Sequence, residues 1–412
     1  MCLVPYCSCP SWLNSERMVA MTSLERVWTA LEHREPDHVP YDCCGTTVTS
    51  LSIVAFQRAM QYRGYPDTYD ETEMADVISQ IVNPPEENLL LLESDTRRIG
   101  ALRVFDLPKR LRNQGEVAII QDQYGCVWKM EEGKDLYFNQ IDAPFTRCAS
   151  IEEMVATFRM PDLSQRREEF FSLFDAQVRK ASTGTAFIVD RVCAGLTEMF
   201  FRFRGYEQGL IDMMENPKEV RDILERIADY KIQYWDIVGD YIELRDMEDS
   251  VLVASECDDL GTQQSLLVSP SELSDIVFPP MRRYLEWMKK KLPGCRIFFH
   301  CDGSIRSIIP DLIEMGIDIL NPIQYSAAGM DLKELKRDFG KELVFWGAGI
   351  DTQETLVKGP VQKIRDEVRG NIETLAPGGG YVFAPIHNVQ ADVPPEHFWA
   401  MWEAWKEFGK YR

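Results

Sequence analysis

Two histidines of this 412-residue chain end apolar, strand-like segments, where their side chains could take part in chemistry. His300 ends the segment RIFFH and is followed by Asp302, while His387 ends the segment YVFAPIH. Side chains two residues apart on extended backbone point to the same side, so His300 and Asp302 can face one ligand. Imidazole and carboxylate groups bind zinc, and catalytic zinc sites leave one position open for water or substrate. The pattern therefore predicts a zinc site built on His300 and Asp302, with His387 as a third candidate ligand.

Other roles for these residues stay open from the sequence. His300 could be a structural histidine of the core that is hydrogen-bonded to Asp302. Cys301 should point the opposite way, toward the helices, but a bulge in the strand would make Cys301 the ligand in place of Asp302. The three remaining histidines flank helices, where we expect surface or capping roles.

Polar residues also end the other strand-like segments in the second half of the chain. In a barrel of parallel strands, active sites lie where the strands finish and on the loops that follow. The residues placed there are Glu256, Asp258, Asp259, His300, Asp302, Asn321, Gln324, Asp351, His387 and Asn388. This concentration predicts that the active site lies at these strand ends.

The segments that carry these residues alternate between strand and helix patterns. Six apolar strands follow from Phe187 onward, separated by amphipathic helices such as the one that Pro217 opens after Asn216 as its cap. Strands that are apolar throughout are typical of parallel sheets buried on both faces. HVPYDCC makes a seventh strand, and we expect an eighth in LLLLESDTRRIG or ALRVF. We predict an α/β fold, a (β/α)8 TIM barrel. An open doubly wound sheet is the alternative, although no GxGxxG or GxxxxGK[ST] loop follows any strand.

The remaining sequence fits one domain with a small insertion. Residues 1–20 form an irregular leader, and Thr22-x-x-Glu25 is a capping-box pattern that predicts the first helix. Residues 21–412 are predicted to form a single catalytic barrel. Near residues 115–146 the pattern changes to β-hairpins, with too little apolar content for a core of their own.

Composition excludes several classes of partner. The chain has 66 acidic and 45 basic residues, a net charge of −21, which argues against nucleic-acid or anionic-membrane partners. No apolar run approaches the roughly 20 residues of a membrane span, and the N-terminus lacks the pattern of a secretory signal. Eleven cysteines without repeated CxxC pairs do not suggest a disulfide framework. We therefore expect a cytoplasmic protein.

Three stretches of the sequence are similar to a known family. They are SLERVWTALEHREPDHVPYD, HCDGSIRSIIPDLIEMGIDILNPIQ, and LVFWGAGIDTQETL with the later APGGGYVFAPIHNVQADVPPEHF. Together they resemble the uroporphyrinogen decarboxylase superfamily, from about Met21 to the end of the chain. The resemblance is closest to its branch of corrinoid-dependent methyltransferases. It implies a (β/α)8 barrel and allows a homodimer, since the superfamily includes homodimers.

The chain departs from two motifs of the superfamily. The decarboxylases carry an arginine-rich RQAGRY-type motif after the first strand, where this chain has YDCCGTTVTS without an arginine. A substrate with many carboxylates needs several cationic partners, so uroporphyrinogen itself is not the expected substrate. The coenzyme M methyltransferases bind zinc through His-x-Cys and a later Cys. Here His300 keeps the histidine, Asp302 replaces the first cysteine, and His387 stands near the second.

This ligand change implies a particular reaction. Carboxylate and imidazole ligands leave zinc more electrophilic than thiolates do, which suits an oxygen leaving group. The chain therefore looks like the first methyltransferase of an O-demethylase system, which moves a methyl group from a methyl ether, often a methoxylated aromatic, to a Co(I) corrinoid. The corrinoid is expected on a partner protein, because the sequence has no DxHxxG-type cobalamin motif.

In this scheme His300, Asp302 and Glu256 are the catalytic residues. Zinc is held by His300, His387 and a carboxylate from Asp302 or Glu256. The residues predicted to bind the substrate, or to orient it or the metal ligands, are Tyr41, Asp258, Asn321, Gln324, Tyr325, Trp346 and Asp351.

Three rival functions remain. A decarboxylase for a smaller acid could hold one carboxylate on Arg191, at the end of AFIVDRV. A methyltransferase with a thiol acceptor such as coenzyme M is disfavoured by the missing cysteine ligands. A non-catalytic barrel that only binds a ligand or a corrinoid protein predicts no tightly held metal.

Overall fold

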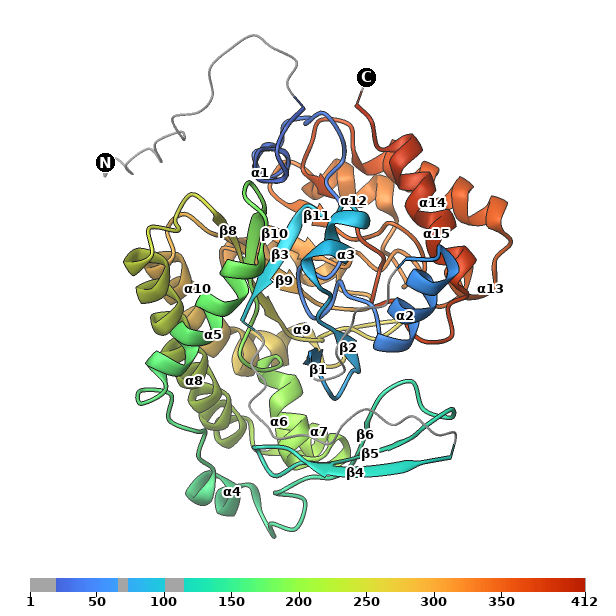
Figure 1. Cartoon of the computed structure of the whole chain (residues 1–412). Helices are drawn as coiled ribbons and strands as arrows, with labels where there is room; N and C mark the ends of the chain where they lie inside the picture. The colour runs from blue at the N-terminus through green and yellow to red at the C-terminus, as the bar shows by residue number, and fades with distance from the viewer. Residues whose placement is uncertain (1–19, 66–72, 101–114, 412) are drawn as a thin grey trace.

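A parallel β-sheet of seven strands forms the centre of the protein (Figure 1). The computed structural model describes residues 20–65, 73–100 and 115–411. In spatial order the strands are β3 (Thr96–Ile99), β7 (Ala186–Val189), β8 (Val251–Cys257), β9 (Arg296–His300), β10 (Ile319–Asn321), β11 (Val344–Trp346) and β12 (Tyr381–Val382). Their spatial order follows chain order, and every neighbouring pair is parallel. Nearly all of their residues are buried, as apolar strands covered on both faces must be.

The segment around Tyr41 joins the two edges of this sheet. Tyr41 pairs with Phe383, just after β12, in a parallel bridge, and Phe383 N donates to Pro40 O at 2.8 Å. On the other side, Asp95 N, next to β3, donates to Tyr41 O at 2.9 Å. The sheet therefore closes into the predicted barrel, with HVPYDCC between β12 and β3, and the open-sheet alternative is wrong. The last expected strand is β3, within LLLLESDTRRIG, while ALRVF lies outside the described residues.

Helices surround the barrel and link successive strands. Between the strands the chain forms α5 (Arg167–Lys180), α6 (Leu196–Arg204), α7 (Tyr206–Glu215), α8 (Pro217–Leu244), α9 (Pro270–Glu272), the π-helical η1 (Leu273–Val277), α10 (Phe278–Lys291), the 3-10 helix η2 (Arg306–Ile308), α11 (Ile309–Glu314), α12 (Leu332–Phe339), α13 (Thr355–Lys358), α14 (Val361–Leu375) and, after β12, α15 (Pro395–Phe408). The helix expected to open at Pro217 is α8. It buries Val220, Ile223, Leu224 and Ile227 on one face, as its periodicity predicts.

Shorter elements lie before and beside the barrel. They are α1 (Ser23–Leu31), α2 (Ile53–Tyr62), β1 (Met74–Asp76), β2 (Ile81–Val82), α3 (Glu86–Leu91) and α4 (Ile151–Thr157). The capping box of α1 is present, because the Thr22 side chain accepts from Glu25 N and the Glu25 carboxylate accepts from Thr22 N. Most of the predicted leader, residues 1–19, lies outside the described residues. Among the described helices, none has both the length and the apolarity needed to cross a membrane.

The predicted insertion forms a separate three-stranded antiparallel sheet. Its strands are β4 (Val117–Gln121), β5 (Val127–Glu131) and β6 (Asn139–Asp142), drawn along the lower edge of Figure 1 beside α6 and α7. The insertion is fixed to α6 by Gln140 Nε2, which donates to Arg202 O at 2.6 Å. Since α6 starts just after β7 ends, the insertion lies at the end of the barrel where the strands finish.

Alternation along the strands separates the barrel interior from the helix layer. Phe298, Ile319, Val344 and Trp346 pack with each other inside the barrel. His300 stands two residues after Phe298 and so faces inward above this packed interior. Cys257 of β8 is paired in register with His300. Its neighbour Glu256 therefore faces the opposite way, toward the helices.

Candidate metal centre

Three of the four predicted metal ligands meet at the mouth of the barrel. One ligand atom from each of His300, Asp302 and His387 lies within 4.8 Å of the others. His300 Nε2 is 3.7 Å and His387 Nε2 is 3.9 Å from Asp302 Oδ2. These distances are too long for hydrogen bonds, so the two rings surround the carboxylate without bonding to it. We call these three residues the His–Asp–His cluster. That it binds a metal stays a prediction.

His300 is held in one orientation by Asn321, at the end of the next strand. His300 Nδ1 is 2.6 Å from Asn321 Oδ1, and Asn321 Nδ2 donates to Trp346 O at 2.7 Å. Because the second bond fixes which way the amide points, Asn321 presents an acceptor and the His300 proton must be on Nδ1. The lone pair of Nε2 then faces Asp302. A hydrogen bond of this kind to the far nitrogen is typical of metal-binding histidines.

Asp302 lies on a tight turn directly after β9. Its backbone N donates to Asp259 Oδ1 at 3.0 Å, and Gly303 N donates to Gln324 Oε1 at 2.8 Å. Gly303 has φ +91°, and a Cβ there would lie 2.6 Å from Thr262 O, so this turn requires glycine. Asp302 Oδ1 is buried and has no hydrogen-bond partner among the described residues. A buried carboxylate oxygen without a partner is costly, and a bound cation would satisfy it.

The alternative in which Cys301 replaces Asp302 is not what the structure shows. Cys301 Sγ is buried and accepts from Leu260 N at 3.3 Å. It therefore packs between strand and loop, while Asp302 joins the cluster.

Glu256 does not belong to the cluster, contrary to the prediction. Its Oε2 accepts from Lys231 Nζ at 2.6 Å and its Oε1 accepts from Trp235 Nε1 at 2.7 Å, and both charged side chains are 0% exposed. Lys231 and Trp235 come from α8. The physical reason is strand alternation: Glu256 is still within β8, so it faces the helices while Cys257 faces the mouth.

The seven residues predicted to bind the substrate, or to orient it or the metal ligands, do not line the cavity at the mouth. Two of them support the cluster, as predicted, since Asn321 orients His300 and Gln324 holds the turn after Asp302. Trp346 is buried inside the barrel, where its Nε1 donates to Asp42 at 2.8 Å. Asp258 is also buried, and it accepts from the N and Oγ1 of Thr197, at the start of α6.

The other three predicted contacts lie in the outer layer. Tyr41 packs against Trp405 of α15, with ring centroids 4.7 Å apart. The Tyr325 hydroxyl and the Asp351 backbone N both donate to Glu367 Oε1 of α14. These residues follow or flank strands, but their side chains or bonds are directed to helices, which the sequence pattern does not reveal.

A cavity of about 420 Å³ opens at the mouth next to the cluster. His300 and His387 form part of its wall, together with Asp259, Glu198, Cys257 and Arg191. Further wall residues come from the insertion and from α6, and these are Asp122, Gln123, Tyr124, Trp128, Tyr137, Met199 and Arg202. The insertion thus borders the mouth and supplies aromatic side chains to the wall of the cavity.

The sequence reasoning missed most of this wall. Asp259 stood at a noted strand end, and Arg191 was named only for a rival function. Tyr124, Trp128 and Tyr137 lie in the insertion, about 160 or more positions before His300, so no local pattern could connect them to it.

Burial sets the protonation of the groups around the cluster. Desolvation lowers the pKa of His300, so its ring is neutral at neutral pH, as a metal ligand must be. Asp259 is half-buried, and its desolvation together with the nearby Glu198 and Asp302 charges raises the pKa of its carboxyl. This acid, whose Oδ1 lies 4.0 Å from His300 Nε2, therefore holds its proton more strongly than an ordinary carboxyl does.

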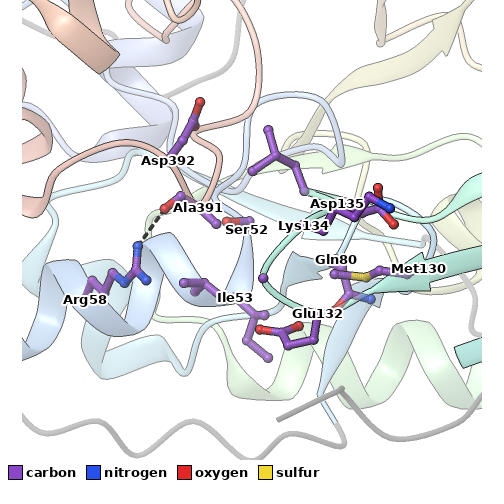
Figure 2. Close-up of a pocket in the computed structure, with 13 residues that line it drawn as sticks. Ser52, Ile53, Arg58, Gln80, Met130, Glu132, Lys134, Asp135, Ala391 and Asp392 are labelled. Carbon is purple, nitrogen blue, oxygen red and sulfur yellow. Dashed lines mark hydrogen bonds between the residues drawn. The ribbon is translucent and has the colours of Figure 1, made fainter. Parts of the chain in front are cut away.

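A second cavity, of about 210 Å³, lies between α2, the hairpin turn after β5 and the loop after β12 (Figure 2). Arg58 closes one side of it, where its Nη1 donates to Ala391 O at 2.7 Å. Glu132, Asp135 and Lys134 line it as well, so charges of both signs meet there. No residue of the His–Asp–His cluster lines this cavity, so the mouth cavity, which His300 and His387 line, is the candidate active site.

Comparisons with known proteins agree with this architecture. A search of curated proteins found no match. Among solved structures, a methyltransferase from Methanosarcina mazei aligns over 94% of this chain and 99% of its own, with a TM-score of 0.63 and 18% identity. A xylanase from Thermoanaerobacterium saccharolyticum (11% identity, 52% of this chain and 82% of its own) and an endo-1,4-beta-xylanase from Caldicellulosiruptor owensensis (10%, 61% and 86%) have TM-scores of only 0.31 and 0.28.

The match to a family rests on sequence. The model of the uroporphyrinogen decarboxylase family (URO-D) matches residues 152–408, which run from α4 to α15 and hold the whole His–Asp–His cluster. The barrel expected from that resemblance is the barrel that the structure has. The chain belongs to the uroporphyrinogen decarboxylase family.

Proposed function

We propose that this protein is a methyltransferase that takes a methyl group from a methyl ether, a methoxylated aromatic compound, and passes it to the Co(I) corrinoid of a partner protein. The His–Asp–His cluster in the wall of the mouth cavity is the observation that carries this proposal. The shared fold with a protein described as a methyltransferase supports it.

The residues of the cluster fit a zinc ion. They offer two imidazole nitrogens and one carboxylate, a donor set that catalytic zinc sites use. Asp302 has a buried oxygen without a partner, and Asn321 keeps Nε2 of His300 available. Zinc would be held by His300, Asp302 and His387. When bound, it would supply a Lewis acid next to the ether oxygen and so favour departure of the phenolate.

The chain's own residues would bind and orient the methyl donor. Tyr124, Trp128 and Tyr137 give the cavity an aromatic wall suited to a benzene ring. In the transfer, the electron pair of Co(I) forms a bond to the methyl carbon while the carbon–oxygen bond breaks. The phenolate oxygen would leave with the electron pair of the broken carbon–oxygen bond and later take a proton from water. An open mouth is required, because the corrinoid must reach the methyl group from outside the barrel.

A thiol acceptor is less well supported than a corrinoid. Thiol-activating zinc sites use thiolate ligands, and Cys301, which could have supplied one, points away from the cluster. Cys257 lies at the mouth, but its Sγ donates to Glu198 Oε2 at 3.3 Å, and burial raises the pKa of its thiol well above the usual value.

Metal content and methyl transfer test the proposal together. The purified protein should retain about one zinc per chain after mild dialysis against chelator, and His300→Ala and His387→Ala should each lose it. With methoxybenzenes and chemically reduced cob(I)alamin, the wild type should form methylcobalamin and a free phenol, both visible by absorbance and chromatography. A wild type that binds no zinc, even after zinc is added back, would contradict the mechanism.

Decarboxylation of a small aromatic acid is the second candidate. Arg191 lines the cavity and could hold a carboxylate there, which favours this reading. The two functions separate cleanly, since a decarboxylase releases CO2 without any corrinoid, and the methyltransferase releases none.

A further inference from the structure

Arg191 is a buried cation in the wall of the mouth cavity. It follows β7 directly, and only 14% of its side chain is exposed. The cavity that it lines is the one that His300 and His387 also line. A guanidinium in such a place is poorly hydrated, so an anionic group of a ligand would be favoured beside it.

Asp190 positions Arg191 but uses only part of the hydrogen-bonding capacity of its guanidinium. Arg191 Nη1 donates to Asp190 Oδ1 at 3.2 Å. The same carboxylate also accepts from Ser255 Oγ and, through Oδ2, from Thr47 N, so its charge is shared among several donors. Within residues 20–65, 73–100 and 115–411, Asp190 is the side chain that bonds to this guanidinium. A guanidinium has five N–H donors in a planar fork, so further N–H groups of Arg191 remain available to bind a carboxylate of a ligand.

The second arginine of the cavity wall has other contacts. Arg202 lies over the ring of Trp128 at 5.5 Å and beside Glu198 at 3.7 Å, and 35% of its side chain is exposed. Glu198 in turn accepts from Gly195 N and from the Cys257 thiol. Arg202 therefore joins the insertion to α6, whereas Arg191 is directed into the space shared with the cluster.

Strand register places Arg191 at a useful separation from the cluster. Val189 is paired with Ala254 and Cys257 is paired with His300, so Arg191 lies about one residue below the level of His300. One strand, β8, separates β7 from β9. Two strand spacings put the two backbones about 10 Å apart. Arg191 and His300 both line the mouth cavity of about 420 Å³, which has room for one benzene ring that carries a carboxylate and a methoxy group.

We propose that Arg191 anchors a carboxylate of the methyl donor, which makes the donor a methoxylated aromatic acid. The carboxylate lies on the guanidinium of Arg191 and the methoxy group faces the His–Asp–His cluster. This inference rests on the proposed function for the identity of the reacting group, but the binding that it predicts does not require the reaction.

Calorimetry with two matched ligands tests the anchor. The probes are 4-methoxybenzoate and 4-methoxybenzamide, which share size and ring but differ in charge. The wild type should bind the benzoate more tightly. Arg191→Gln should weaken benzoate binding about 10- to 100-fold, as expected for loss of charge-assisted bonds, and leave benzamide binding unchanged. Arg191→Lys should recover part of the loss. Arg58→Gln, in the second cavity, is the matched control and should change neither affinity.

Several results would overturn the anchor. They are equal weakening of both ligands by Arg191→Gln, no preference of the wild type for the benzoate, or no binding of either ring. If Arg191→Gln fails to fold, Arg191→Lys and the wild-type preference still decide the matter. Benzoate binding that depends on Arg191, without methyl transfer to cob(I)alamin, would support the anchor and refute the proposed function. CO2 release from the benzoate would then favour the decarboxylase.

Discussion

Two carboxylates near the ends of neighbouring strands, Glu256 in β8 and Asp302 just after β9, differ in how their oxygens are satisfied. Glu256 faces α8, and both of its oxygens accept short hydrogen bonds, from Lys231 and from Trp235. Asp302 faces the mouth, where one oxygen is buried without a partner among the described residues. Its other oxygen lies 3.7 Å and 3.9 Å from two imidazole nitrogens. The protein itself therefore satisfies both oxygens of Glu256, whereas one oxygen of Asp302 is left for a ligand.

The difference teaches how to separate structural from functional acids in this fold. Both were predicted as metal ligands because both end a strand next to other polar residues. A buried carboxylate whose oxygens already accept hydrogen bonds from the protein has no free site for a ligand. Ligand-type side chains that converge without bonding to each other indicate a site for a bound ion or substrate. The comparison therefore predicts that substitutions at Glu256 and its partners lower the stability of the fold, and that substitutions at Asp302 and its neighbours weaken metal binding.

The largest effect should come from breaking the closed pair. Lys231→Met leaves the Glu256 charge buried without its cation, which should lower the free energy of unfolding by about 3–5 kcal/mol. Urea unfolding followed by circular dichroism measures this. Lys231→Met combined with Glu256→Leu should recover most of the loss, because no charge then remains buried. A loss below about 1 kcal/mol in the single variant would mean that water reaches Glu256.

On the open side, Asp302→Asn should abolish zinc binding with little change in stability. The substitution keeps the shape of the side chain and removes its charge, so zinc affinity should fall by more than about 100-fold, beyond the loss caused by a supporting residue. Competition with a chromogenic chelator measures the affinity, and urea unfolding in chelator should agree with the wild type within about 1 kcal/mol. Asp351→Asn, whose residue lies away from the cluster, should bind zinc normally. A variant that keeps its zinc would remove Asp302 from the ligand set.

Asn321 should matter less than the ligands, because it acts through His300. Asn321→Ala removes the acceptor that holds the proton on His300 Nδ1, so zinc affinity should drop about 10- to 100-fold. Asn321→Asp keeps an acceptor at that position and should bind zinc better than Asn321→Ala does. The same chelator competition, repeated across pH, distinguishes a lost orienting bond from general damage. Identical affinities for the two variants would show that Asn321 only packs.

Much of the fold was predictable from the sequence because its signals are local. Apolar strands alternate with amphipathic helices, and Pro217 and the Thr22 capping box mark helix starts that the structure confirms. The hairpins near residues 115–146 were also predictable, because the spacing of apolar residues changes there from a helical to a strand-like period. The eighth strand could not be chosen, since β3 (TRRI) has little apolar character, and its burial comes from its place in the barrel.

The residues of the site were predictable only where their spacing along the sequence determines which way their side chains point. His300 and Asp302 stand two apart at a strand end, and their convergence followed from that spacing. Glu256 was misplaced because the sequence does not show that β8 continues through Cys257, so the side that Glu256 faces was unknown. The cavity wall depends on contacts between the insertion and α6, which are long-range and leave no periodic signal.

The smallest expected change in stability concerns Asp258, which follows Glu256 by two residues. Like Glu256 it accepts hydrogen bonds from the protein, and like Asp302 it lies near the mouth. It accepts hydrogen bonds at the start of α6, yet burial and the nearby Glu198 charge raise the pKa of its carboxyl to about 7. The folded protein then keeps a proton that the unfolded chain releases near its ordinary pKa of 3.8. The stability due to this group is therefore fully present below pH 3.8 and is lost as the pH rises through about 7.

Asp258→Asn, which is neutral at every pH, should remove this dependence. Between about pH 6 and pH 8 the wild type should lose about 1 kcal/mol more stability than the variant does, as urea unfolding at several pH values will show. Asp259→Asn separates this effect from that of the adjacent acid, since Asp259 does not bond to α6. Parallel pH profiles for the wild type and Asp258→Asn would mean that Asp258 is ionised throughout, with its hydrogen bonds to Thr197 outweighing its burial. Asp258 would then belong with Glu256, as an acid satisfied by the fold alone.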